Sequence, residues 1–322
     1  MKKIFLSAMN VFIAIKNVIR FFPVVMNYWM HNKDNFDDNL SIAAFVRNEA
    51  SFLKEWIEYH KLVGVDRFYI YDNYSDDNTI EILDEYIRSG IVIYKLFPGE
   101  KKHGIEVQMA AYNDIIKNVR NKTKWLGIID ADEFIVPLKT DDILSSIKLI
   151  EGKVKNAQNI PAIGIFWVIF GYDGNENKPD GLVLENYKKS LDKSKLKNIP
   201  AAWNWLRDEQ VKSIINPRMT YAYTIHDGKF LWDAKRIDEL GRELDINKIT
   251  IECIRVNHYW TKSYQEFKEK CMRNINAFGG SNLEMKYYIS GYTPDFLSHK
   301  EDFVVGRFVS KIKECMKGMQ RN

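Results

Sequence analysis

The chain has 322 residues, of which 46% are hydrophobic and 28% charged, and this composition excludes disordered and fibrous proteins. The length suits one large α/β domain with a sizeable core. The net charge of +4 lies at the two ends, because residues 1–33 contain five basic residues and no acid, and residues 303–322 contain five basic residues against one acid. An acidic body between basic ends argues against nucleic acid as a partner and favours contact with an anionic membrane surface.

The N-terminal residues 1–36 are predicted to form an amphipathic extension. Two lysines precede an apolar run from Ile4 to Ile15, but Lys16 and Arg20 interrupt the apolar character, and no small-residue cleavage site follows. The run is shorter than the roughly 20 residues that span a bilayer, so we expect neither cleavage nor a span. The segment is either an interfacial helix or a helix that packs on the domain, and the sequence leaves both open.

The cysteines form an odd set without the spacing of a metal or disulfide motif. Cys253, Cys271 and Cys315 are far apart, so the sequence predicts neither a disulfide framework nor a zinc site. Such usage is typical of a reducing compartment. We therefore expect a cytoplasmic protein, with peripheral contact on the inner face of the plasma membrane if the extension is interfacial.

The first half of the chain alternates predicted strands and helices. Nearly continuous apolar stretches such as LSIAAFV and WLGII are typical of strands covered on both faces. The alternation predicts a doubly wound, mostly parallel sheet with its ligand site at the carboxyl ends of the strands. A less regular second half, with an apolar strand at 163–170, forms the acceptor side of the same domain. Strands are expected at 40–46, 67–71, 91–96 and 125–129, with helices between them at 52–60, 79–89 and 106–119.

Polar residues follow three of these strands directly. Asp130 and Asp132 lie two positions apart, so both side chains point to one side of an extended backbone. Two such carboxylates suit a hard cation, Mg²⁺ or Mn²⁺, bridged to a substrate diphosphate. A pair of solvated loop acids is the alternative, and the position after the fourth strand favours the metal site. The three polar strand ends are Arg47-Asn48-Glu49, Asp72-Asn73 and Asp130-Ala131-Asp132.

Ordered motifs carry a resemblance to a known family. IAAFVRNEASFLKEWIEYHKLVGVDRFYIYDNYSDDNT and WLGIIDADEFIVP resemble glycosyltransferase family 92 and the related family 2-like GT-A glycosyltransferases. FWVIFGYDG, GLVLENY, VKSIINP, a histidine at His226 and NHYWTKSYQEFKEKCMRN follow in the family's order, so the resemblance covers roughly residues 40–280. It implies a GT-A type α/β fold, a Rossmann-like, mostly parallel sheet flanked by helices. The expected organisation is a helical N-terminal extension at 1–36, one catalytic domain at 37–290 and a basic helical C-terminal tail at 291–322.

The resemblance also implies an activity. The chain would transfer a hexosyl group from a nucleotide sugar, with UDP-galactose or UDP-glucose expected, to a glycan or glycolipid acceptor with inversion. By this analogy, Arg47, Asn48 and Glu49 line the nucleotide pocket, Asp72 and Asn73 reach the uracil or ribose, and Asp130 contacts the donor. The residues leave two other interpretations open, namely that Asp72 caps the next helix and that Arg47 pairs with Glu49 at the surface.

Two other classes of protein could use the same acids. A metal-dependent phosphoester hydrolase would need further ligands close to the acidic pair, and the sequence has none there. An inactive carbohydrate- or nucleotide-binding module would not need the intact pair Asp130 and Asp132. The sequence indicates no oligomeric state.

The catalytic base and the last metal ligand are chosen by position. Asp173, in FGYDG, follows a central strand and is the candidate base for the acceptor hydroxyl. Its rivals are Asp208 and Glu209, and a turn before Gly174 is the alternative role. His258 is predicted to complete the metal site, which would favour Mn²⁺ over Mg²⁺ because an imidazole suits Mn²⁺ better.

The alternative roles of His258 are a hydrogen bond to a donor phosphate or packing beside an aromatic residue. The aromatic side chains nearby either stack on sugar rings or fill the core, and we expect at least two of them in the core. These aromatic residues are Trp203, Trp205, Tyr259 and Trp260.

Overall fold

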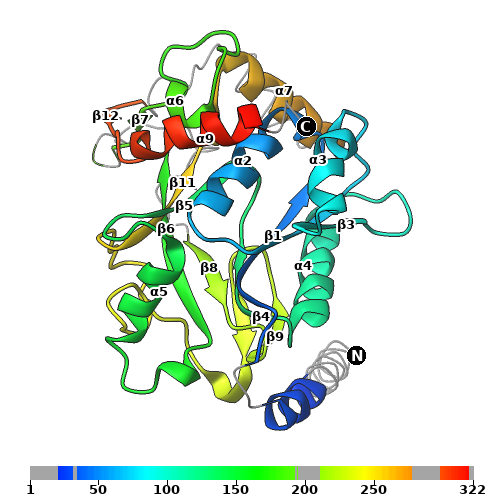
Figure 1. Ribbon diagram of the computed structural model, residues 1–322, viewed down its shortest axis with the longest axis vertical. Helices are drawn as coiled ribbons and strands as arrows, with labels where there is room; N and C mark the ends of the chain where they lie inside the picture. The colour runs from blue at the N-terminus through cyan, green and yellow to red at the C-terminus, as the bar shows by residue number, and fades with distance from the viewer. Residues whose placement is uncertain (1–20, 32–34, 193, 195–210, 278–297, 319–322) are drawn as a thin grey trace, which may run out of the picture.

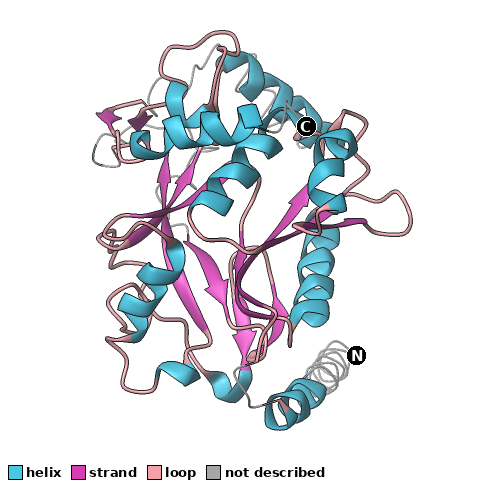
Figure 2. Ribbon diagram, viewed as in Figure 1, coloured by secondary structure: helices cyan, strands magenta, loops and turns pink. Residues whose placement is uncertain are grey.

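The computed structural model describes residues 21–31, 35–192, 194, 211–277 and 298–318 (Figure 1). A central sheet of eight strands is flanked by helices, as Figure 2 shows in magenta and cyan. The strand order is β3-β2-β1-β4-β8-β6-β11-β5. The strands are β1 (Asp38–Val46), β2 (Arg67–Asp72), β3 (Val92–Leu96), β4 (Thr123–Ile128), β5 (Glu133–Pro137), β6 (Ala162–Ile169), β8 (Val211–Ile215) and β11 (Ile254–His258).

The sheet is mostly parallel, as predicted. Neighbours among β3, β2, β1 and β4 are parallel, and so are β6 and β11. The strand β8 is antiparallel to both β4 and β6, and β5 is antiparallel to β11. Two of the eight strands, β8 and β5, therefore run against the other six.

The helices of the first half lie close to their predicted positions. They are α2 (Ala50–Leu62), α3 (Thr79–Arg88) and α4 (Ile105–Val119). The remaining elements are α5 (Ile143–Glu151), η1 (Ala157–Asn159), α6 (Val183–Asn186), β7 (Lys189–Ser190), β9 (Thr220–Tyr223), β10 (Gly228–Phe230), η4 (Leu231–Asp233), α7 (Tyr264–Ala277), β12 (Lys300–Glu301) and α9 (Gly306–Gly318).

Both faces of the sheet are buried, which explains the nearly continuous apolar strands. Along β1, Ile42 and Ala44 belong to a core shared with α2, α3, α5 and α9. The intervening residue Ala43 belongs to a second core on the opposite face, built mainly on α4. Successive side chains of a strand point to opposite faces, so a strand between two helical layers needs apolar residues at every position.

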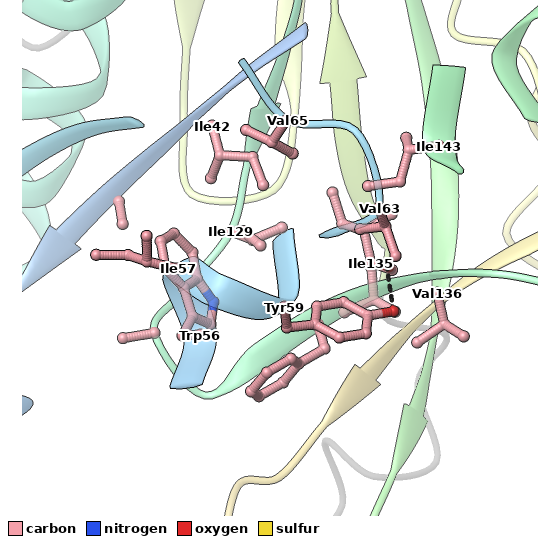
Figure 3. Close-up of a cluster of buried hydrophobic side chains, with 14 of the residues drawn as sticks. Ile42, Trp56, Ile57, Tyr59, Val63, Val65, Ile129, Ile135, Val136 and Ile143 are labelled. Carbon is pink, nitrogen blue, oxygen red and sulfur yellow. Dashed lines mark hydrogen bonds between the residues drawn. The ribbon is translucent and has the colours of Figure 1, made fainter. Parts of the chain in front are cut away.

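The helix α2 covers the exposed edge of β5 (Figure 3). Trp56 Nε1 donates to the carbonyl of Glu133 at 2.8 Å, and the Tyr59 hydroxyl donates to the carbonyl of Ile135 at 3.0 Å. His60 Nε2 accepts from the backbone N–H of Ile135 at 3.2 Å, because burial lowers the pKa of His60 to about 3 and keeps the ring neutral. Side chains thus satisfy an edge strand that would otherwise present unpaired backbone groups.

The C-terminal helix α9 packs across α2. Its Phe308 ring meets the Tyr59 ring edge to face at 5.4 Å, and Ile312 is fully buried. Arg307 donates to the backbone carbonyl of Pro137, and Lys313 pairs with Glu185. The basic C-terminal region therefore contributes to the main core, while the predicted domain boundaries stay a prediction.

Near the N-terminus, residues 21–30 form a helix beside the lower end of the sheet in Figure 1. Val24 is buried, and the Tyr28 ring packs on Trp232 with centroids 4.8 Å apart. Within the described ranges, no helix combines the length and apolar character that crossing a membrane requires.

Candidate active site

The acidic pair lies where the chain leaves β4 and crosses to β5, at the far edge of the sheet. The carboxyl ends of β4, β6 and β11 meet at this place because these strands run in one direction. Glu133, the first residue of β5, stands opposite His258, the last residue of β11. The topology therefore brings Asp130, Asp132 and His258 together, at the strand ends where the sequence predicts the site.

Asp130 is held by a buried lysine. Lys212 Nζ, on β8, lies 2.9 Å from Asp130 Oδ2 and 3.3 Å from Glu133 Oε2, and both Lys212 and Glu133 are fully buried. The other oxygen, Asp130 Oδ1, accepts from the Tyr112 hydroxyl at 3.1 Å and from Gln108 Nε2 at 3.3 Å. Burial opposes ionisation of Asp130, but Lys212 outweighs it and keeps the pKa of Asp130 below its ordinary value.

Asp132 lies beside Lys270 and His258, two side chains from the second half of the chain. Its Oδ2 accepts from Lys270 Nζ on α7, and its Oδ1 lies 3.5 Å from His258 Nε2. Burial again opposes ionisation, but Lys270 and then His258 lower the pKa of Asp132 well below its ordinary value. Asp132 is therefore an anion across the neutral pH range.

Glu133 and His258 each leave a polar atom unsatisfied. Glu133 Oε1 and His258 Nδ1 are buried, lie 3.8 Å apart and have no hydrogen-bond partner among the described residues. Burial raises the pKa of Glu133 well above its ordinary value, and burial lowers that of His258. A neutral His258 that donates from Nδ1 towards Glu133 would present the lone pair of Nε2 beside Asp132.

These side chains fit a divalent cation in part. Among the described residues, no group of three or more His, Cys, Asp or Glu side chains is placed to hold a metal ion. The three predicted ligands therefore lie close together without forming a three-ligand metal site among the described residues, because Lys212, Tyr112 and Gln108 engage the Asp130 carboxylate. Asp132 Oδ1 and His258 Nε2 remain, and one or two protein ligands suffice where diphosphate oxygens and water complete the coordination.

Asp72 and Asn73 lie at the predicted strand end but have partners within the protein. Asp72 Oδ1 accepts from the Ser75 backbone and hydroxyl, and its Oδ2 accepts from the Tyr94 hydroxyl at 2.8 Å. Asn73 Nδ2 donates to the carbonyls of Phe97 and Lys102. The two side chains shape the loop that follows β2, and their contact with a nucleotide stays a prediction.

Of the three residues that follow β1, Asn48 and Glu49 interact with other residues of the protein, whereas Arg47 has an unsatisfied donor. Asn48 has a φ of 58°, and its Nδ2 donates to Asp76 Oδ1 at 2.5 Å, which ties the β1 and β2 loops together. The Glu49 side chain attracts the buried Lys262. Arg47 Nε is buried and has no hydrogen-bond partner within the described part of the chain. Of the three residues, Arg47 therefore has a buried side-chain donor that no described group satisfies.

Asp173 shapes a turn. It has a φ of 56°, and its carboxylate accepts from the backbone N–H groups of Lys188 at 2.6 Å and Lys189 at 3.0 Å. This is the turn role that the sequence left open, and the role of Asp173 as a base stays a prediction. Its rivals Asp208 and Glu209 lie outside the described residues.

Two of the four aromatic residues predicted to stack on sugar or fill the core lie within the described residues. Tyr259 is fully buried in the core and stacks on Phe170 with centroids 4.6 Å apart, as the core alternative predicted. Trp260 packs on Phe267 at 5.1 Å. Trp203 and Trp205 lie outside the described residues.

Three lysines of the site were not singled out from the sequence. Lys212 interrupts the apolar strand VKSII, and a charged residue at such a position is the pattern that could have revealed it. Lys262 and Lys270 lie within the motif NHYWTKSYQEFKEK, where nothing distinguishes them from surface lysines. Together they place positive charge beside the acids of the site, of which Asp132 and Glu133 are buried and Asp130 is 32% exposed.

Solved structures resemble the chain over about half of its length. Staphylococcus aureus TarS, residues 1–349, in complex with UDP is 11% identical, covers 56% of this chain and 47% of its own, and has a TM-score of 0.32. A second structure is glucosyl-3-phosphoglycerate synthase from Mycobacterium tuberculosis in complex with Mn²⁺, UDP and glucosyl-3-phosphoglycerate. It is 16% identical, covers 40% of this chain and 44% of its own, and has a TM-score of 0.26.

Sequence relatives cover more of the chain. A glycosyltransferase family 92 protein of Ricinus communis is 29% identical over 247 residues, which is 74% of this chain and 38% of the relative. A family 92 protein of Oryza sativa subsp. japonica is 37% identical over 99 residues, which is 30% of this chain and 16% of the relative. The chain spans well under half the length of these relatives. The profile of glycosyltransferase family 92 matches residues 40–285, from β1 to beyond α7, and this match shows that the chain belongs to glycosyltransferase family 92.

Proposed function

We propose that the chain transfers a hexosyl group from a UDP sugar, galactose or glucose, to a hydroxyl of a glycan or glycolipid acceptor. The observation that carries the proposal is the convergence of Asp130, Asp132 and His258 with two lysines, Lys212 and Lys270, at this edge of the sheet. Family membership supports the same reaction. The relatives and solved structures named above include one with UDP and one with both UDP and Mn²⁺.

Each residue of the cluster has a defined task in this proposal. Asp132 and His258 hold a divalent cation, which neutralises the charge of the leaving diphosphate when bound. An imidazole ligand favours Mn²⁺ over Mg²⁺. Asp130, kept ionised by Lys212, accepts hydrogen bonds from donor hydroxyls, and Lys270 adds positive charge near the phosphates.

Inversion requires a base for the acceptor hydroxyl. Asp173 stays our candidate, since burial raises its pKa above the ordinary value and brings the carboxylate closer to the range of a general base. Replacing Asp173 by Asn, with its turn preserved, tests this role through the pH profile of turnover.

A thermal-shift panel tests the donor and the cation together. We expect UDP-galactose or UDP-glucose with Mn²⁺ to raise the unfolding temperature, because a ligand at 100 times its dissociation constant stabilises by about 2.7 kcal/mol. Mg²⁺ should give a smaller shift. No shift with any nucleotide sugar would contradict the proposal.

Asp132→Asn tests the metal role directly. The change removes a charge without removing core volume, so we expect a folded protein that has lost Mn²⁺-dependent donor binding and sugar transfer. His258→Ala should raise the Mn²⁺ concentration that half-saturates donor binding. Asp84→Asn, at an exposed position of α3, is the matched control and should behave like the wild type. Normal turnover in Asp132→Asn would overturn the metal role.

We also propose a cytoplasmic location with peripheral contact between the N-terminal segment and an anionic membrane. The basic, acid-free residues 1–33 support it. The helix at 21–30 supports it as well, since Phe22, Trp29 and Met30 are 62%, 68% and 65% exposed.

A further inference from the structure

Trp167 stands between two histidine rings at the carboxyl end of β6. Its ring centroid lies 4.4 Å from that of His258 and 5.4 Å from that of His226. Lys212 Nζ, which holds Asp130, lies 5.7 Å from the indole centroid. Trp167 therefore borders the acidic cluster directly and is only partly buried.

One ring nitrogen of Trp167 and one of His226 lack a hydrogen-bond partner within the described part of the chain. Trp167 Nε1 and His226 Nδ1 are both buried, and neither has a hydrogen-bond partner among the described residues. Leaving a buried polar atom unsatisfied costs about 1–3 kcal/mol, so two such atoms on neighbouring rings point to a polar ligand. Burial lowers the pKa of His226 to about 4, so at neutral pH the ring offers one donor and one acceptor.

The backbone holds both rings in place. Trp167 lies in β6 opposite Val256 of β11. His226 lies in the connection between β9 and β10, where Arg236 Nη1 donates to the carbonyl of His226 at 2.9 Å and to Ser213 Oγ at 3.2 Å. A strand and an anchored hairpin present the two rings in a fixed arrangement, as recognition of a rigid ligand requires.

We infer that Trp167 and His226 form a binding face for a pyranose ring beside Asp130. The inference rests on the proposed function and specifies how that site recognises sugar. Trp167 Nε1, at the edge of the indole ring, donates to one hydroxyl group of the sugar, and the His226 imidazole bonds a second hydroxyl group. The sugar is the donor hexose or the acceptor hexose, which share this chemistry.

Trp167→Phe tests the face because it keeps an aromatic ring and removes the N–H donor. The donor arm compares UDP with UDP-glucose and UDP-galactose by titration calorimetry in the presence of Mn²⁺. If the donor hexose binds here, affinity for the UDP sugar falls about tenfold, the cost of one hydrogen bond, while affinity for UDP is unchanged. Trp125→Phe, a buried tryptophan of β4, is the matched control for the general effect of the substitution.

The acceptor arm uses methyl glucoside and methyl galactoside with saturation-transfer NMR, in the presence of UDP and Mn²⁺. If the acceptor hexose binds here, Trp167→Phe and His226→Ala both weaken the saturation transfer, while the donor affinities stay at the wild-type value. Unchanged results in both arms, with a normal unfolding temperature, would overturn the inference and assign the rings to packing.

Failure of the proposed function gives a different result. If the wild-type protein binds neither UDP nor a UDP sugar, the proposed function is wrong. The methyl hexosides without nucleotide then test the face alone: saturation transfer that depends on Trp167 supports it, and no transfer overturns it.

Discussion

Asp132 is the residue at which the proposed cation and the protein compete. Lys270 Nζ donates to Asp132 Oδ2 and also to the carbonyl of Trp260 at 3.4 Å, and its side chain is 20% exposed. A divalent cation at Asp132 repels this ammonium group, whereas a donor diphosphate attracts it. In our proposal, Lys270 therefore couples the binding of the cation to that of the donor, and the coupling must be reciprocal.

Lys270→Met should change the two affinities in opposite directions. Without a nucleotide, Mn²⁺ should bind more tightly, because Asp132 loses a competing charge. With Mn²⁺ present, UDP should bind roughly tenfold to a hundredfold more weakly, since a charge-assisted hydrogen bond contributes about 1.5–3 kcal/mol. Titration calorimetry measures both. Lys268→Met, at an exposed position of the same helix, is the control, and equal Mn²⁺ affinity in all three proteins would refute the coupling.

At the scale of elements, α2 organises the region around the site through one buried carboxylate. Glu55 is 5% exposed and accepts from the backbone N–H groups of Val183 at 2.8 Å and Leu184 at 3.0 Å, the first residues of α6. Burial outweighs these hydrogen bonds and raises the pKa of Glu55 from 4.5 to about 7. The α2–α6 contact is therefore sensitive to pH.

The sign follows from the direction of the shift. With the folded pKa above the unfolded one, the folded state binds more protons between pH 4.5 and about 7. Glu55 contributes most to the free energy of unfolding below this pH window. Roughly 3 kcal/mol of that free energy is lost as the pH rises through the window. Glu55→Gln cannot ionise, so its free energy of unfolding should fall less between pH 5 and pH 8.

Urea denaturation of both proteins at pH 5 and pH 8 measures the difference. Glu81→Gln, at an exposed position of α3, should keep the wild-type pH dependence. Parallel pH profiles for Glu55→Gln and the wild type would show that Glu55 titrates alike in the folded and unfolded states.

At the scale of the whole molecule, the helix at residues 21–30 exposes apolar side chains, and basic residues flank it in the sequence. Met26, Trp29 and Met30 are exposed by 43%, 68% and 65%, while Val24 and Tyr28 turn towards the domain. The C-terminal basic residues behave differently, since Arg307 and Lys313 have partners within the domain. Membrane contact therefore belongs to the N-terminal segment in our proposal.

The double substitution Trp29→Ser with Met30→Ser should release the protein from vesicles that contain phosphatidylserine. The fold should persist because both side chains are exposed. Added salt should weaken binding of the intact protein, as screening affects its Lys and Arg contacts. Vesicle sedimentation measures binding, and Ile249→Ser, which removes an exposed apolar side chain elsewhere, is the control. Equal sedimentation of the double variant and the wild type would exclude Trp29 and Met30 as membrane contacts.

The sequence by itself determined the first four strands, their helices and the strand end that carries the acidic pair. These features are local, since apolar periodicity and turn residues act over a few positions. Locality also explains the ambiguity at Asp72, because the sequence cannot tell whether a loop carboxylate accepts from its own loop or from a ligand. The structure adds Ser75 and Tyr94 as its partners.

Only the tertiary structure decided which side chains meet the acidic pair. Lys212 reaches Asp130 across 82 residues and Lys270 reaches Asp132 across 138 residues. Trp167 and His226 join the same cluster from two further segments. Such contacts depend on the order and direction of strands across the sheet, and no local pattern encodes them. The acids are therefore recognisable in the sequence, whereas the lysines that keep them ionised are identified only from the tertiary structure.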